Sequence, residues 1–146
     1  MTRLFNATAI PYEDLTCKAQ ENVNITRLIA ALALRGVECF RVNNDKHCAD
    51  VVAHDPTTGM NLNIQVKGNR RILVEDKYQN RNVWIATWDP ERLAFFIYNH
   101  DDAMTAMRNT GRWMKKGQIG TSNGGFAVSL LALLTDEADG EWIDCS

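Results

Sequence analysis

Apolar and polar residues alternate along the chain in patterns that predict one helix followed by several strands. Between Thr16 and Arg35, apolar residues recur at the three- and four-residue spacing of an amphipathic helix, and Gly36 then provides a stop. Residues 37–44 alternate between two faces and end in an asparagine-rich turn signal, which predicts a strand. The chain therefore begins with a helix and continues into a sheet.

The middle of the chain predicts further strands in two pairs. Segments 47–54 and 60–68 are joined by Asp-Pro-Thr-Thr-Gly, a turn sequence, so together they predict a β-hairpin. After a polar and basic loop, segments 82–89 and 92–99 predict two more strands joined by a short turn.

The last third predicts helices. Residues 101–109 suit a short helix that begins at one of its first two aspartates, and residues 122–137 suit a last apolar helix capped near Ser122 or Asn123. A helix, then strands, then helices predicts an α/β or α+β sheet with helices packed on it.

Length and composition indicate one globular domain spanning residues 1–146, because 146 residues with 45% apolar content can bury a core. No run approaches the roughly 18 apolar residues of a membrane span, and the polar start lacks the pattern of a secretion signal. We therefore expect a cytoplasmic protein with no membrane contact. The four cysteines form no CxxC pair, so we expect reduced thiols.

The net charge of −2 hides a division along the chain. Residues 136–146 hold five acidic residues and no basic one, which predicts an acidic C-terminal tail and leaves a net charge of +3 on the rest. Basic residues cluster within 67–81 and again within 108–116. By themselves such clusters are most simply explained as solvated faces.

One face of the predicted hairpin is polar where the middle of the sheet is expected. A four-residue loop over 56–59 places Asp50 opposite Gln65, and side-chain alternation puts Lys67 on the same face. Directly opposed residues have Cβ atoms roughly 4.5 to 5.5 Å apart. A carboxylate and an amide oxygen at that separation can hold one cation between them.

This arrangement predicts a site for phosphodiester hydrolysis. Hard divalent cations such as Mg²⁺ prefer oxygen ligands and keep several waters, so Asp50, Gln65 and the backbone carbonyl of Val66 are enough protein ligands. Such a cation polarises a phosphoryl oxygen and lowers the pKa of a bound water, while Lys67 orients the water or stabilises transition-state charge. The expected cofactor is Mg²⁺ or Mn²⁺.

The same residues resemble a known motif. An aspartate and, after 14 intervening residues, the sequence QVK follow an amphipathic helix and the phrase LALRGVECFRVNNDKHCADVVAHD. This is similar to the PD-(D/E)XK nuclease superfamily over roughly residues 18–98. Within it, the phrasing most resembles small intron-associated homing endonucleases with a QxK variant. Archaeal-type Holliday junction resolvases and restriction endonucleases are more distant kin.

The resemblance implies a restriction-endonuclease-like mixed β-sheet flanked by helices and a metal-dependent endonuclease that acts on duplex or branched DNA. By the same resemblance Asp50 binds metal, Gln65 takes the Glu/Asp position and Lys67 is the catalytic lysine. The family often adds an acid from the first helix, and Glu21 fits that place. A homodimer or higher oligomer is implied too, with the strand AFFIYN or the last helix as its interface.

The resemblance implies that some residues of the two basic clusters contact nucleic acid. Three of their residues follow the catalytic strand, where a phosphate backbone would pass, and two more follow Trp113. The expected nucleic-acid contacts are therefore Arg70, Arg71, Lys77, Lys115 and Lys116.

Two other functions remain open from the sequence. Gln65 is neutral, so the chain is alternatively a catalytically inactive nuclease-fold protein that binds or inhibits a partner. A toxin-type nuclease acting on tRNA is the second alternative, with RNA as the substrate. Glu21, for its part, is also explained as an acid favoured in the first turn of a helix.

Overall fold

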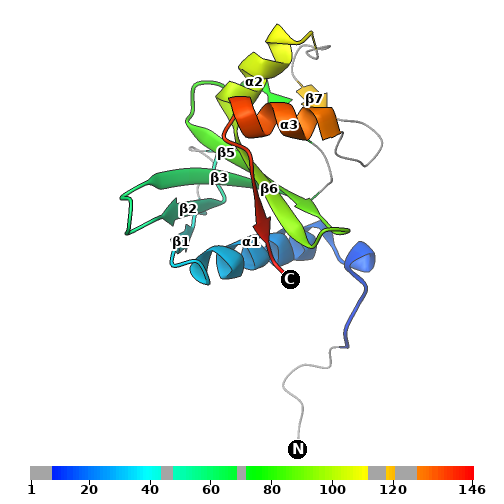
Figure 1. The fold of residues 1–146 in the computed structure, drawn as a ribbon. Helices are drawn as coiled ribbons and strands as arrows, with labels where there is room; N and C mark the ends of the chain where they lie inside the picture. Colours follow the sequence, from blue (N-terminus) through cyan, green and yellow to red (C-terminus); the bar gives the residue numbers. More distant parts are fainter. Residues whose placement is uncertain (1–7, 44–47, 69–71, 112–117, 121–127) are drawn as a thin grey trace, which may run out of the picture.

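In the computed structural model, the residues described are 8–43, 48–68, 72–111, 118–120 and 128–146. Six strands form a main sheet, and Figure 1 shows α1 on one side of it and α2 and α3 on the other. The sheet is mixed because β3 and β5 run parallel while the other neighbouring strands are antiparallel. The mixed α/β sheet flanked by helices, implied by the resemblance, is therefore confirmed.

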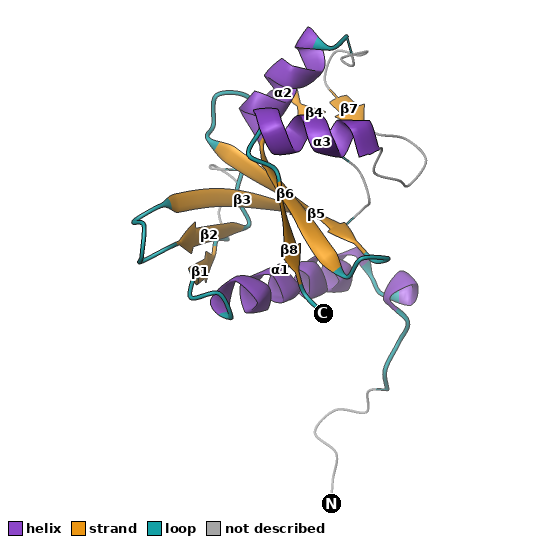
Figure 2. Cartoon of the chain, viewed as in Figure 1, coloured by secondary structure: helices purple, strands orange, loops and turns teal. Residues whose placement is uncertain are grey.

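The strand order of the main sheet is β1-β2-β3-β5-β6-β8. Its strands are β1 (Glu38–Arg41), β2 (Val51–His54), β3 (Asn61–Lys67), β5 (Val83–Asp89), β6 (Ala94–Asn99) and β8 (Glu141–Asp144). A second, small sheet pairs β4 (Leu73–Glu75) with β7 (Gln118–Gly120), and Figure 2 shows it beside α2 and α3.

The helices are α1 (Cys17–Ala33), α2 (His100–Asn109) and α3 (Val128–Glu137), with short 3₁₀ turns η1 (Tyr12–Asp14) and η3 (Asp76–Tyr78). None of the helices in the described part of the chain is long and apolar enough to cross a membrane.

Helix α1 forms where the apolar spacing predicted it. The Thr16 side chain accepts the Ala19 N–H and caps its start, and Gly36 follows its end with a positive φ of 79° that suits glycine. Its buried face packs on one side of the sheet, in a cluster that includes Ile25, Leu28, Leu32, Val51, Ala53, Ile64 and Ile143.

The register of the β2–β3 hairpin is the one predicted. Val51 lies opposite Ile64 and Ala53 opposite Leu62, and the Asp55 N–H donates to the Met60 carbonyl across the turn. Apolar side chains of the hairpin therefore face α1, and the alternate side chains face the other side of the sheet.

Several predicted boundaries are wrong. Strand β2 begins at Val51 rather than residue 47, so Asp50 lies in a bend before the strand. Helix α2 is capped by Asn99, whose side chain accepts the Asp102 N–H, rather than by an aspartate. The expected start of the last helix falls outside the described residues, which resume at Val128.

Residues 136–146 are part of the fold rather than an acidic tail. They complete α3 and form β8, which pairs with β6 so that Ile143 lies opposite Phe95. Ile143 is buried in the core beside α1. The segment resembles a solvated tail because it contains five acidic residues, but Ile143 within it is an apolar residue that faces the core.

The segment expected to be a polar loop after the hairpin contains β4 and η3. Tyr98 in β6 anchors it: the Tyr98 hydroxyl donates to the Leu73 carbonyl (2.8 Å) and accepts the Leu73 N–H (2.7 Å). Tyr98 is wholly buried, and burial raises the pKa of its hydroxyl, which therefore stays protonated.

Replacing Tyr98 by phenylalanine should lower the free energy of unfolding by about 2 to 3 kcal/mol, because both backbone groups of Leu73 lose a buried partner. Denaturant unfolding measures the change. Thr135→Val, which removes an exposed hydroxyl bonded to the Leu131 carbonyl, is the control and should change stability by less than about 0.5 kcal/mol. Equal effects of the two substitutions would contradict the anchoring role of Tyr98.

Candidate functional site

The predicted site lies just before the start of β2, beside the last residues of β3. The Asp50 carboxylate accepts two hydrogen bonds through Oδ2, from the Val66 N–H (2.8 Å) and from Gln65 Nε2 (2.9 Å). The Asp50 N–H donates to the Ile64 carbonyl at 2.8 Å. The Asp50 side chain thus bonds to the backbone of β3 where the backbone pairing between β2 and β3 has ended. It also contacts the Gln65 side chain directly.

Lys67 is the last residue of β3, and its ammonium is held by a residue that the sequence did not suggest. Lys67 Nζ lies 2.9 Å from the Tyr78 hydroxyl and 5.4 Å from the centre of its ring. Tyr78 comes from η3 and is 3% exposed. No pattern in the sequence marks it, because the contact depends on how η3 folds back over β3.

His100 supports the segment that carries Tyr78. Its ring packs edge-on against Tyr78, with 5.5 Å between centroids, and its Nε2 accepts the Glu75 N–H at 3.0 Å. Burial lowers the pKa of His100, which favours the neutral ring that this acceptor role requires. His100 is thus a positioning residue two contacts away from Lys67.

The electrostatic surroundings of Asp50 oppose its negative charge. Burial raises the pKa of its carboxyl, and the nearby carboxylate of Glu21 raises it further. The Val66 N–H and the cations of Lys67 and Arg41 act in the other direction without reversing the shift. A charged Asp50 is therefore held where additional positive charge would be stabilising.

Glu21 lies near the site but makes its own pair. Its side chain is 43% exposed and forms an ion pair with Lys18, at 2.8 Å on the same helix. Glu21, Val66 and Lys67 nevertheless line one hollow of about 420 Å³ between the first turns of α1 and the end of β3. The structure brings Glu21 to the edge of the candidate site.

Asn24 lines the same hollow one turn further along α1, and the sequence analysis did not identify it as a site residue. It is 2% exposed, and its Nδ2 donates to the Tyr12 hydroxyl at 2.7 Å, whereas its Oδ1 has no partner among the described residues. A Cβ on Gly68 would lie 2.7 Å from Asn24 Nδ2, so this close approach requires glycine. The available signal was a polar residue on the buried face of the predicted helix.

The donor set fits a hard divalent cation, although the described residues contain no group of three or more His, Cys, Asp or Glu side chains placed to hold a metal. Asp50 offers a carboxylate. The Val66 carbonyl points to the same side of β3 as the N–H that Asp50 binds, since both groups of a strand residue face one neighbour. Gln65 turns its amide nitrogen to Asp50, and a half-turn of the amide would present its oxygen there.

Of the five residues predicted to contact nucleic acid, only Lys77 lies among the described residues. Arg70, Arg71, Lys115 and Lys116 fall outside the described residues. Lys77 is exposed and forms an ion pair with Glu75 at 2.9 Å, which raises the pKa of Lys77 and keeps it charged. Its role in binding nucleic acid stays a prediction.

A solved structure with a similar fold is the Holliday junction resolvase Hjc of the archaeal hyperthermophile Archaeoglobus fulgidus. The TM-score is 0.54, and the match covers 78% of this chain and 88% of that chain at 14% sequence identity. No protein-family model matches the sequence, and no curated protein matches it. At this identity the likeness shows the fold alone, so the chain has a resolvase-like fold.

Replacing Asp50 by asparagine should raise the melting temperature in metal-free buffer at neutral pH, because it removes a charge that the fold disfavours and keeps an oxygen for the Val66 N–H. A native pKa above the unfolded value of about 3.9 means that protonation stabilises the native wild type. The difference between the two proteins should therefore shrink as the pH falls towards 4.

Thermal denaturation between pH 4 and pH 8 tests this expectation. Asp102→Asn, at an exposed position in the first turn of α2, is the control and should not be stabilising. An Asp50→Asn protein that melts below the wild type at neutral pH would show that the charge is instead well accommodated.

Proposed function

We propose that this protein is a metal-dependent endonuclease that hydrolyses phosphodiester bonds in DNA. The observation that carries the proposal is the contact between Asp50, Gln65 and the Val66 N–H at the open end of a hairpin, in a chain with a resolvase-like fold. Burial and the nearby Glu21 carboxylate disfavour the charge on Asp50, which supports a role in binding a cation.

In this proposal Asp50, Gln65 and the Val66 carbonyl hold Mg²⁺ or Mn²⁺, with Glu21 as a further ligand from α1. A bound divalent cation supplies polarisation of a phosphoryl oxygen and a lower pKa for a water at the site. Asp50 contributes the negative charge that binds the cation, and its bond to Val66 fixes its direction relative to β3.

Lys67 acts on the phosphate. Its ammonium has three N–H donors, of which the Tyr78 hydroxyl can engage one, so the others can reach a phosphate oxygen. In a partly dry site, this charge stabilises the extra negative charge of the transition state. Tyr78 is the positioning residue that holds the ammonium in place.

The proposed substrate is duplex or branched DNA, because the structural neighbour is named as a Holliday junction resolvase. The basic residues Arg70, Arg71, Lys77, Lys115 and Lys116 would contact the phosphate backbone. One site cuts one strand, so a homodimer is proposed as well. The AFFIYN strand cannot supply its interface, since β6 lies between β5 and β8, which leaves α3 with its exposed Val128.

A second candidate is a nuclease-fold protein that binds or inhibits a partner without turnover. Gln65 favours it, because a neutral amide adds no charge to the site and here donates its N–H to Asp50. The two candidates differ in whether the site binds a divalent cation and whether Lys67 matters for a reaction.

The cleavage assay should compare the wild type with Lys67→Ala and Tyr78→Phe on duplex, single-stranded and branched DNA and on tRNA, with Mg²⁺ and with Mn²⁺. Removing the Lys67 charge should lower the rate by about 10²- to 10³-fold. Tyr78→Phe should cost less, since the lysine remains. Arg35→Ala, which removes a charge just beyond the end of α1 and away from Glu21, is the control. Equal activity of the wild type and Lys67→Ala would refute the proposed role.

Metal binding can be tested without a substrate. A cation that binds the native state should stabilise it by about 2.7 kcal/mol when its free concentration is 100 times Kd, so the melting temperature should rise with Mg²⁺ or Mn²⁺. Asp50→Asn should remove the rise, and Asp102→Asn should keep it. No response in the wild type would favour the non-catalytic candidate.

A further inference from the structure

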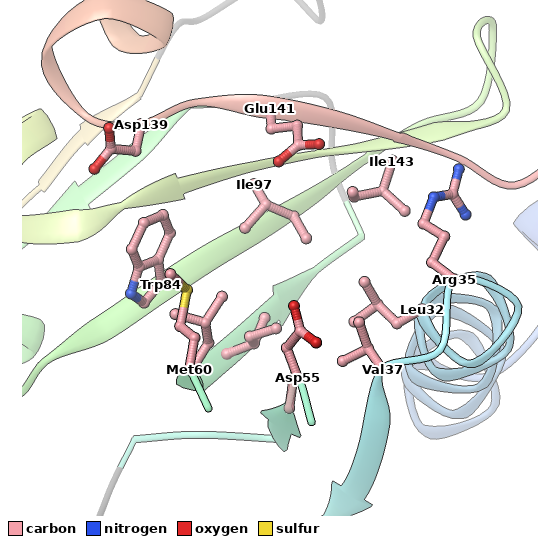
Figure 3. A pocket seen from close by; sticks show the side chains of 13 residues that line it. Leu32, Arg35, Val37, Asp55, Met60, Trp84, Ile97, Asp139, Glu141 and Ile143 are labelled. Carbon is pink, nitrogen blue, oxygen red and sulfur yellow. The ribbon is translucent and has the colours of Figure 1, made fainter. Parts of the chain in front are cut away.

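A second hollow lies on the α1 face of the sheet, which the Gln65 side chain faces away from. It has a volume of about 610 Å³, and its apolar floor comes from strands of the main sheet, including Ile64, Trp84, Ile97 and Ile143. Leu32 from α1 and Val37 close one end, as Figure 3 shows. Because side chains alternate along β3, Ile64 faces this groove while Gln65 faces the other side.

The groove exists because one helix is too narrow for this sheet. Six strands spaced by about 4.8 Å span roughly 24 Å, whereas a helix with its side chains is about 10 to 12 Å wide. The opposite face carries both α2 and α3, but this face carries α1 alone (Figure 1). Beside α1, the sheet leaves Met60 exposed and Leu62 and Trp84 partly exposed, whereas Ile64 and Ile97 beneath them are buried.

The rim of the groove is acidic. Asp55 stands at the β2–β3 turn and Glu141 at the start of β8, on opposite sides of the groove in Figure 3, and Asp139 adds a third carboxylate. The backbone N–H of Thr57 lowers the pKa of Asp55, so this carboxylate stays ionised. The cation on the rim, Arg35, donates to the carbonyls of Ala31 and Asp144 within its own chain.

These charges select the chemistry of the occupant. A second copy placed by a two-fold axis would bring the same three carboxylates of each chain towards one another, which is unfavourable. An amphipathic helix with an apolar stripe and flanking lysines or arginines would instead match both the floor and the rim.

We infer that this acidic-rimmed groove, formed by the apolar floor and by Asp55, Asp139 and Glu141, binds a basic amphipathic helix of a partner protein. The helix lies beside α1 and places its cations against the three carboxylates. Because the groove lies beside the end of α1, at Leu32 and Val37, whereas the Asp50 site lies beside its first turns, at Glu21, binding leaves the proposed site uncovered. The partner therefore recruits the protein without blocking its proposed site.

The test uses full-length ¹⁵N-labelled protein and two synthetic 15-residue peptides with the same helical spacing of leucines. One peptide carries lysine at all the positions between the leucines, and the second peptide carries glutamate at those positions. The lysine peptide should shift the Trp84 indole and Ile97 amide signals in NMR spectra and bind more weakly as salt rises, and the glutamate peptide should not bind.

Variants at exposed rim positions make the test specific. Asp139→Lys combined with Glu141→Lys should weaken the lysine peptide by roughly tenfold and admit the glutamate peptide. Asp102→Lys combined with Glu137→Lys makes the same change in net charge on α2 and α3, away from the groove, and should leave both affinities near those of the wild type. Met60→Gln, a neutral change at an exposed apolar position in the lining, should weaken the lysine peptide through loss of the apolar contact.

Three results would overturn the inference. Equal binding of the two peptides would show that the rim does not select charge. Signal shifts confined to residues outside the groove would place the binding elsewhere. Concentration-dependent shifts of Trp84 and Ile97 without peptide would show that a second copy occupies the groove. None of these results depends on nuclease activity.

Discussion

The hydrogen bond from the Val66 N–H to the Asp50 carboxylate is the contact on which the candidate site depends. Strand β2 has four residues and β3 has seven, so the end of β3 extends past its antiparallel neighbour. Asp50 supplies a side-chain oxygen where the backbone of β2 no longer pairs, and this fixes a half-buried carboxylate beside Gln65. Burial raises the pKa of Asp50, and shifted pKa values of this kind cluster at functional sites, which supports the proposed role of Asp50 as a metal ligand.

The two faces of the sheet have different chemistry because alternation along β3 separates them. Ile64 and Val66 face the core beneath α1, whereas Gln65 and Lys67 face the side on which η3 brings Tyr78. On that second side the polar side chains bond to one another: Gln65 donates to Asp50, and Lys67 contacts the Tyr78 hydroxyl. On the first side, α1 leaves part of an apolar surface uncovered, and acidic residues from the β2–β3 turn and from the start of β8 lie around it.

The sequence was sufficient where local patterns decide the structure. The apolar spacing of α1 and the alternation of the hairpin, with its turn at 55–59, predicted the helix, the register and the convergence of Asp50 and Gln65. It failed where distant segments meet. Tyr78 reaches Lys67 through a turn that Tyr98 anchors from β6, and β8 was hidden because its acidic residues resemble a solvated tail while Ile143 alone shows its buried face. Asn24 was visible as a polar residue on an apolar helix face, but what distinguishes it is that its Oδ1 has no partner among the described residues.

The most direct test of the site is the anomalous diffraction of a crystal soaked with Mn²⁺. The account predicts a peak within coordination distance of the Asp50 carboxylate and the Val66 carbonyl, with the Gln65 amide turned so that its oxygen faces the ion. The account would be contradicted if no peak appeared at the site at a saturating Mn²⁺ concentration and Gln65 still donated its N–H to Asp50. The Asp50–Gln65 contact would then be a structural pair that closes the end of the hairpin.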